Sequence, residues 1–233
     1  MILRIFRFAV GLMILPFCFV ITQTLIDILD SLNPGASEIL NPPLVVMTGG
    51  FIIWQIVYFL MPRPVRTYVL AHELTHALWG TLMGATVSKI SVKKDHGYVS
   101  LSKTNFLITL APYFFPLYTF LVIIAFYISS IFIDMRPYYL VWLCLVGFTW
   151  GFHLNFTLST LLQHQPDIKQ CGHLFSYVVI YLLNVAGICI WAVMVSNATL
   201  QGMIELFYRH TVADAVLIWH KGCQLFQLLY NNG

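Results

Sequence analysis

The chain has 233 residues, of which 59% are hydrophobic and only 9% are charged. A soluble domain carries roughly 25% charged residues, so this composition excludes an ordinary soluble globule and favours a membrane protein. The net charge is +3, and the few basic residues form no cluster of the kind that binds nucleic acid. The five cysteines are an odd number, and their spacing suits neither a disulfide framework nor a cysteine metal site.

The N-terminal part of the chain predicts two membrane helices. The first apolar run, Ile5 to Ile26, has Arg4 and Arg7 at its start and is too long for the core of a signal peptide, so we expect a retained helix. Asp27 to Pro43 is acidic and contains prolines, which indicates an external loop. A second helix is expected over Leu44 to Met61. Because Arg63 and Arg66 follow it, the positive-inside rule predicts a cytoplasmic N-terminus and a cytoplasmic junction here.

The third expected helix, about Arg66 to Ala85, carries the sequence His72-Glu73-x-x-His76. Four residues are about one helical turn, so the two histidines share a face and each can offer a ring nitrogen to one zinc ion. Glu73 can then lie beside water on that ion and accept its proton. The flanking residues are apolar enough to lie in lipid, where ionisable groups are costly and are usually retained for function. We therefore interpret the motif as a metal site inside the membrane, near its cytoplasmic side.

Two features of the sequence follow the histidine motif. Gly80 and Gly84 form a Gly-x-x-x-Gly pair, which either lets another helix pack closely or reflects the ordinary use of glycine in membrane helices. From Val87 to Ser102 apolar residues alternate with polar ones around Asp95-His96-Gly97, which predicts a β-hairpin. The hairpin is either a simple connector or an edge on which an extended substrate binds by strand addition. We expect His96 to be a turn residue and not a ligand.

The rest of the chain predicts three more membrane helices and a tail. The helices are expected over Ile108 to Ile133, Tyr138 to about Leu162 and Leu174 to Ser196. Pro112 and Pro116 should kink or open the first of them. The second is unusual for its polar residues His153, Asn155, Thr157 and Thr160. The tail, Leu200 to Tyr230, mixes charges with leucines and aromatics and predicts an amphipathic helix at the membrane surface.

These segments predict an all-α, multi-pass membrane protein with about six membrane helices, a small β-hairpin and a C-terminal amphipathic helix. The helix with the histidine motif either spans the membrane or is short and re-entrant. The hairpin region holds Lys89, Lys93, Lys94 and Lys103, which favour the cytoplasmic side and therefore the re-entrant alternative. The short loops and the absence of accessory domains fit a bacterial inner membrane.

The chain resembles the site-2-protease family of intramembrane zinc peptidases over about Arg66 to Ser196. The resemblance is carried by His72-Glu73-x-x-His76 in a membrane helix, the hairpin after it, and Asp167 followed by Gly172 two helices later. It implies a zinc ion held by His72, His76 and Asp167, with Glu73 as general base. We expect a single membrane domain in three parts: an N-terminal transmembrane pair (1–65), the intramembrane metallopeptidase core that the resemblance covers (66–196) and a C-terminal interfacial helix (197–233).

The third ligand has two candidates in the sequence. The family's usual motif is Asn-x-x-Pro followed by Leu-Asp-Gly, whereas this chain has Gln165-Pro166-Asp167-Ile168. If the third helix spans the membrane, Asp167 arrives at the opposite face from His72, and His153 becomes the better ligand. If it is re-entrant, Asp167 returns to the side of His72. As a non-ligand, His153 or Asn155 would bind substrate or stabilise the oxyanion, or either would simply form a hydrogen bond between two packed helices.

Two functions follow from the sequence. The first is an intramembrane zinc metalloprotease, with one zinc ion per chain, that hydrolyses peptide bonds in or next to transmembrane segments of membrane-protein substrates. The alternative is a catalytically silent membrane protein that binds a metal or a partner. Glu73 favours the enzyme, because a purely structural metal site needs no base beside its first histidine.

Overall fold

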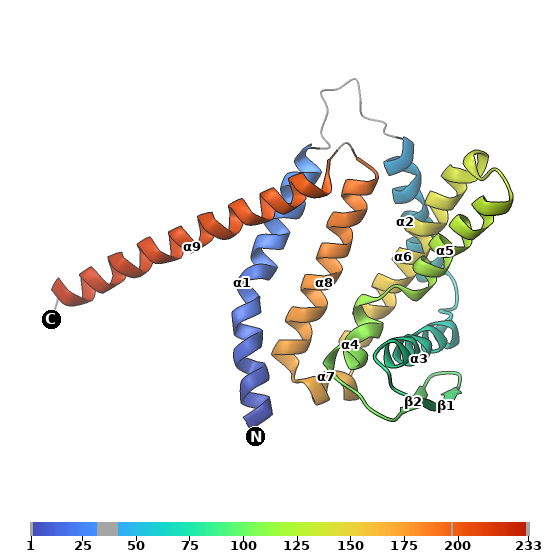
Figure 1. Ribbon diagram of the computed structural model, residues 1–233, viewed down its shortest axis with the longest axis horizontal. Coiled ribbons are helices and arrows are strands. Elements are labelled where there is room, and N and C mark those ends of the chain that lie inside the picture. The colour runs from blue at the N-terminus through green and yellow to red at the C-terminus, as the bar shows by residue number, and fades with distance from the viewer. Residues whose placement is uncertain (1, 32–41, 197, 232–233) are drawn as a thin grey trace.

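The computed structural model describes residues 2–31, 42–196 and 198–231, and these residues form a mainly helical protein with one small sheet (Figure 1). The helices are α1 (Ile2–Ser31), α2 (Pro42–Leu60), α3 (Val65–Leu82), α4 (Phe106–Phe114), α5 (Leu117–Phe132), α6 (Tyr139–Leu161), α7 (Pro166–Cys171), α8 (His173–Met194) and α9 (Leu200–Asn231). The strands are β1 (Val87–Val92) and β2 (Gly97–Leu101), and a short 3-10 turn, η1 (Arg136–Tyr138), precedes α6.

Among the described helices, α1, α2, α6 and α8 are long and apolar enough to cross a membrane. The pair α4 and α5 adds a fifth span if it is counted as one helix bent by 75°. The expected number of about six spans is therefore not confirmed. The helix that falls short is α3, because its histidines, Glu73 and Arg66 lower its hydropathy. It crosses the direction of the long helices, beside the hairpin and at the same end as the N-terminus (Figure 1). The hairpin with its lysines therefore lies at the same end of the molecule as the N-terminus, where the re-entrant alternative expects it.

The prolines predicted to disturb the fourth membrane segment divide it into α4 and α5. Pro112 lies inside α4, and Pro116 directly precedes α5. The bend between the two helices is 75°. Asn105 caps the start of α4, since its side-chain oxygen accepts from the backbone N–H of Ile108 at 2.9 Å. This bend leaves the short helix α4 beside α3, where it faces the histidine motif.

The closest helix packing is between α2 and α6. A Cβ added at Gly147 would collide with the carbonyl oxygen of Met47, and one added at Gly50 would collide with that of Cys144. Gly147 and Gly151 form a Gly-x-x-x-Gly pair on α6, so this pattern marks a real helix contact here. Separately, α1 packs along α8. The two N-terminal helices therefore pack against different partners, and the boundary at residue 65 stays a prediction.

The other glycine pair, Gly80 and Gly84, does not bring a helix close to α3. Gly80 faces Leu101 of β2, whose side-chain atoms would lie 3.0 Å from a Cβ at that position. Gly84 adopts a φ of 73° and ends the helix. The N–H of Ala85 donates to Gly80 and the N–H of Gly84 donates to Thr81, which is the Schellman arrangement. Gly84 therefore terminates α3, and Gly80 lets β2 of the hairpin pack against it.

The hairpin is confirmed. Strand β1 pairs antiparallel with β2, Ile90 lies opposite Val99, and the register shifts between Val87 and Lys89. His96 and Asp95 lie at the exposed turn, with Nδ1 and Oδ1 2.7 Å apart. This contact lowers the pKa of the Asp95 carboxyl. His96 is thus a turn residue, as predicted.

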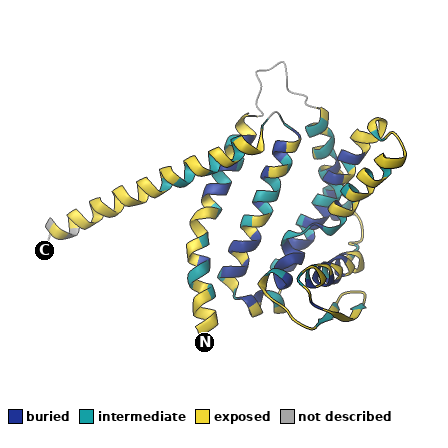
Figure 2. Ribbon diagram, in the orientation of Figure 1, coloured by how far each residue is buried: buried dark blue, intermediate teal, exposed yellow. Residues whose placement is uncertain are grey.

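Both ends of the chain differ in detail from the prediction. Helix α1 continues to Ser31, so Asp27 is helical and its carboxylate lies 2.9 Å from Nε2 of His210 on α9. The rest of the expected loop, residues 32–41, lies outside the described residues. The tail forms one long helix, α9, which packs beside α1 at its start and is mostly exposed beyond (Figure 2). Its position at the membrane surface stays a prediction.

Candidate metal centre

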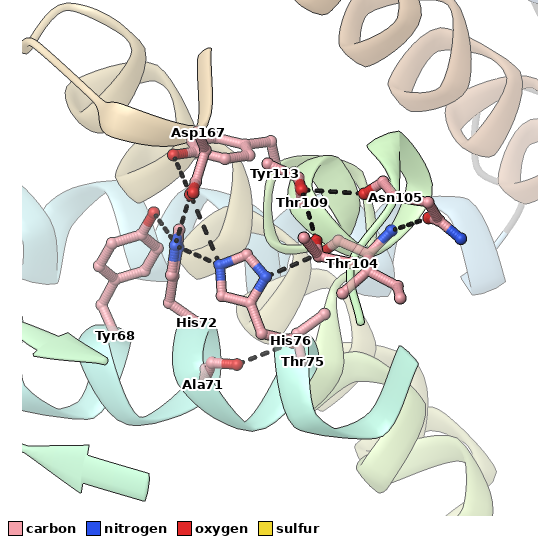
Figure 3. Close-up of polar contacts among 11 residues, drawn as sticks. Tyr68, Ala71, His72, Thr75, His76, Thr104, Asn105, Thr109, Tyr113 and Asp167 are labelled. Carbon is pink, nitrogen blue, oxygen red and sulfur yellow. Dashed lines mark hydrogen bonds and ion pairs between the residues drawn. The ribbon is translucent and has the colours of Figure 1, made fainter. Parts of the chain in front are cut away.

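The two histidines of α3 face an aspartate from a distant part of the chain (Figure 3). The four-residue spacing places His72 and His76 on one face of the helix, where their rings meet edge to face and their Nε2 atoms lie 3.2 Å apart. Asp167, in the first turn of α7, places its Oδ2 atom 3.4 Å from Nε2 of His72 and 3.5 Å from Nε2 of His76. The residue predicted from the re-entrant alternative thus meets both histidines.

The three atoms have the separation that a zinc ion requires. With bonds of about 2.0–2.1 Å, two ligands of a tetrahedral zinc ion lie roughly 3.3 Å apart, and imidazole and carboxylate are ligands that zinc prefers. No other group of His, Cys, Asp and Glu side chains with this geometry occurs in the described part of the chain. Three protein ligands leave one tetrahedral position for water or substrate. The residues therefore fit zinc, and they fit a catalytic site better than a closed structural one.

Each of the three side chains makes a further contact outside the group. Nδ1 of His76 donates to the carbonyl oxygen of Ile108 at 2.8 Å, so in the neutral ring Nε2 presents its lone pair to the centre. The hydroxyl of Tyr68 lies 3.3 Å from Nδ1 of His72. The hydroxyl of Tyr113, a fully buried residue, donates to Oδ2 of Asp167 at 3.1 Å. These contacts orient the ligands before any ion binds.

Glu73 lies beside this group in the wall of a cavity of about 410 Å³. The cavity is also lined by the two histidines, by Asp167 and by residues of β2. The Glu73 side chain is buried, and its carboxylate makes no hydrogen bond to any residue that the structure describes. A carboxylate in this position is free to accept a proton from water in the cavity.

The comparison with protein families bears on this site. The model of the Peptidase M50B-like family matches residues 44–162, which is about half of the chain. The chain belongs to this family. The assignment confirms the resemblance to the site-2 proteases, and the match spans α3 with its histidine motif and the hairpin. It ends before Asp167, so the case for this residue in the M50B-like chain rests on the geometry above. Neither the curated proteins nor the solved structures contain a match.

The structure does not bring His153 into the group. His153 lies on α6, fully inside the bundle, and its Nε2 atom has no hydrogen-bond partner among the described residues. It lines a separate cavity of about 20 Å³ together with His72, Tyr68 and Thr75, which is room for about one water molecule. His153 is therefore a neighbour of the candidate centre and not one of the three converging side chains.

The side chain of Asn155 contacts a neighbouring helix and does not line the cavity of the candidate centre. Its side-chain amide forms two reciprocal hydrogen bonds with Gln55 of α2, at 2.8 and 2.9 Å. The pair joins α2 to α6. Of the roles that the sequence left open for Asn155, the structure supports a hydrogen bond between packed helices.

Three residues around the centre were not predicted. Tyr68 lies four residues before His72, so the helical period placed it on the same face and offered a signal. Tyr113 had no such signal, because its contact with Asp167 joins α4 to α7. A Cβ added at Gly97 would lie 2.7 Å from Cγ of Glu73, a closeness that only the folded hairpin reveals.

Proposed function

We propose that this M50B-like protein is an intramembrane zinc metalloprotease that hydrolyses peptide bonds in or next to transmembrane segments of other membrane proteins. The proposal rests on one observation above all: His72, His76 and Asp167 converge at zinc-ligand spacing in a cavity that Glu73 also lines. The family and the apolar helices support a protease in a lipid bilayer. We place it in a bacterial inner membrane, with one zinc ion per chain.

The proposed roles follow from where the side chains lie. When bound by His72, His76 and Asp167, zinc supplies a Lewis acid that polarises the scissile carbonyl and lowers the pKa of a water from 15.7 to about 7. Glu73 accepts the proton of the attacking water and delivers it to the leaving nitrogen. The outer contacts of Tyr68, Tyr113 and the Ile108 carbonyl hold the ligands in place, so little reorganisation accompanies the reaction.

The cavity suggests how a substrate lies. Gly97, Tyr98, Val99 and Leu101 of β2 line the same cavity as the histidines. Within the described residues β2 pairs only with β1, so its other edge has backbone groups for an extended peptide. A transmembrane helix must unwind to bind in this way, because its backbone groups are otherwise paired internally. We therefore propose that the substrate is cleaved as an extended segment beside β2.

Glu73→Gln tests the proposal. The amide keeps the length of the side chain but does not take a proton, so zinc binding should persist while hydrolysis falls by at least about 10²-fold. The measurement is cleavage of co-expressed single-span membrane proteins, scored with zinc content for the wild type and the mutant. Arg4→Met, a change at an exposed residue of α1 outside the cavity lining, is a suitable control. If the wild type binds zinc and Glu73→Gln preserves every cellular phenotype, the silent metal-binding alternative replaces the enzyme.

A further inference from the structure

The guanidinium of Arg7, near the start of α1, makes one contact that bears on the candidate centre. Its Nη1 atom donates to the backbone carbonyl of Gln170 at 2.6 Å. Gln170 lies in the last turn of α7, where helix carbonyls lack partners within the helix and a cation is favourable. Asp167 lies in the first turn of the same helix. Because α7 has only six residues, a contact at its end also fixes its start.

A second contact explains why α1 comes close enough. Gly11 lies one turn after Arg7, and a Cβ added there would lie 3.1 Å from the backbone nitrogen of Phe175, near the start of α8. This is tighter than an ordinary side-chain contact allows. The absence of a side chain at Gly11 thus lets α1 approach the junction of α7 and α8 and brings Arg7 within reach of Gln170.

Apolar packing joins the same segments. Ile168 and Cys171, both on α7, are 2% exposed and belong to a core cluster that includes Leu110 and Tyr113 of α4. Val10 and Ile14 of α1 pack against this cluster. Tyr113 also donates to Asp167, so the helix that carries this carboxylate is held by α4 on one side and by α1 on another. The family match starts at residue 44, beyond α1.

We infer that the N-terminal part of α1 positions Asp167 for the metal. Arg7 is a positioning residue, and Gly11 is the point at which α1 comes close to α8. The inference rests on the proposed metal site and concerns how its third ligand is held. Removing a group that hydrogen-bonds directly to a metal ligand typically lowers metal affinity by about 10- to 100-fold. Arg7 acts one step further out, through Gln170, so we expect an effect at the lower end of this range.

The test compares zinc affinity of the full-length protein in detergent among three variants. Arg7→Met removes the donor and should weaken zinc binding by about tenfold. Arg7→Lys keeps a donor and the charge, and it should recover most of the affinity. Arg4→Met removes the same charge from an exposed position of α1 that makes no polar contact with the described residues, and it should bind zinc like the wild type. When cobalt replaces zinc in these three variants, the absorption spectrum of the bound cobalt should change in Arg7→Met and stay like that of the wild type in Arg4→Met.

A second pair of variants tests the close approach of α1 to α8 without changing any charged residue. Gly11→Val should push α1 from α8 and weaken zinc binding as Arg7→Met does. Gly49→Val is its control, because an added Cβ at Gly49 meets nothing within 4 Å. Thermal unfolding of the metal-free proteins shows whether each variant folds.

The outcomes separate this inference from the proposed function. Wild-type zinc affinity in folded Arg7→Met and Gly11→Val overturns the inference and leaves the metal site intact. Equal weakening by Arg7→Met and Arg4→Met also overturns it, because charge and not the contact would then be responsible. A wild-type protein that binds no zinc overturns both.

Discussion

His76 takes the carbonyl group that Pro112 leaves free. In a regular helix the N–H of residue 112 donates to the carbonyl oxygen of Ile108, four residues earlier, but proline has no N–H. Nδ1 of His76 donates to this oxygen at 2.8 Å instead. An unpaired carbonyl is costly inside a membrane protein, so one contact both satisfies the backbone of α4 and orients a candidate zinc ligand.

We predict that Pro112→Ala strengthens the fold and weakens the metal site. Alanine restores a helix hydrogen bond and removes a cost of about 3 kcal/mol for an interior proline, so the melting temperature should rise. The new N–H competes with His76 for the Ile108 carbonyl, so zinc affinity should fall by about tenfold. Thermal unfolding and zinc titration measure the two effects. Pro16→Ala, in the interior of α1, is the matched control and should change stability alone. Unchanged zinc affinity in Pro112→Ala would refute the prediction.

Gly97→Ala should impair hydrolysis without releasing zinc. An added Cβ would lie 2.7 Å from Cγ of Glu73 and 2.9 Å from the carbonyl oxygen of Ser91, so the carboxylate must move from its place in the cavity wall. We expect turnover to fall by about 10²-fold, the lower end of what a general base contributes. The assay is cleavage of a single-span substrate together with zinc content. Gly222→Ala, where an added Cβ meets nothing within 4 Å, should behave like the wild type. Loss of zinc from Gly97→Ala would instead mean that the hairpin shapes the metal site.

Asp167→Ala should lower zinc occupancy sharply, whereas His153→Leu should retain the metal. Oδ2 of Asp167 lies within 3.5 Å of both histidine Nε2 atoms, and the three atoms converge on one point. His153 is absent from this group, and leucine keeps the bulk of its buried side chain. Zinc per chain, measured on purified protein, distinguishes the two candidates. Metal loss from His153→Leu with full occupancy in Asp167→Ala would reverse the assignment of the third ligand.

Local sequence patterns predicted the helices and strands of this fold well, but they did not predict which elements contact one another. The long apolar runs, the alternating hairpin and the four-residue histidine spacing are each contained within a short stretch, so the sequence was enough to find them. The expected number of spans was not confirmed, because α3 has a helical pattern but is not among the helices apolar enough to cross a membrane. Its orientation depends on packing against α4 and the hairpin, which no single stretch encodes.

The same limit explains the residues that were missed or misplaced. Two Gly-x-x-x-Gly pairs occur in the chain, and only the pair at Gly147 and Gly151 meets a helix, because the partner backbone decides what the pattern does. Arg7 and Tyr113 reach Asp167 or its helix only after α1, α4 and α7 have come together. Tyr68 was also missed, although helical periodicity puts it one turn before His72 on the same face and could have indicated the contact.

The amide pair Gln55 and Asn155 supplies a test of whether Asn155 belongs to the site or to the scaffold. Asn155→Leu leaves the Gln55 amide without its two partners between α2 and α6, at an expected cost of about 1–2 kcal/mol. Gln55→Leu should cost a similar amount for the same reason.

The double variant Gln55→Leu, Asn155→Leu removes both polar groups, so it should be more stable than the sum of the single changes predicts. Unfolding of the four proteins in one detergent gives the coupling free energy, and cleavage and zinc content are measured on the same samples. If Asn155 only joins the helices, activity should recover in the double variant together with stability. Stability that recovers while hydrolysis stays lost would show that Asn155 contacts the substrate, and the assignment of this residue to the scaffold would then be wrong.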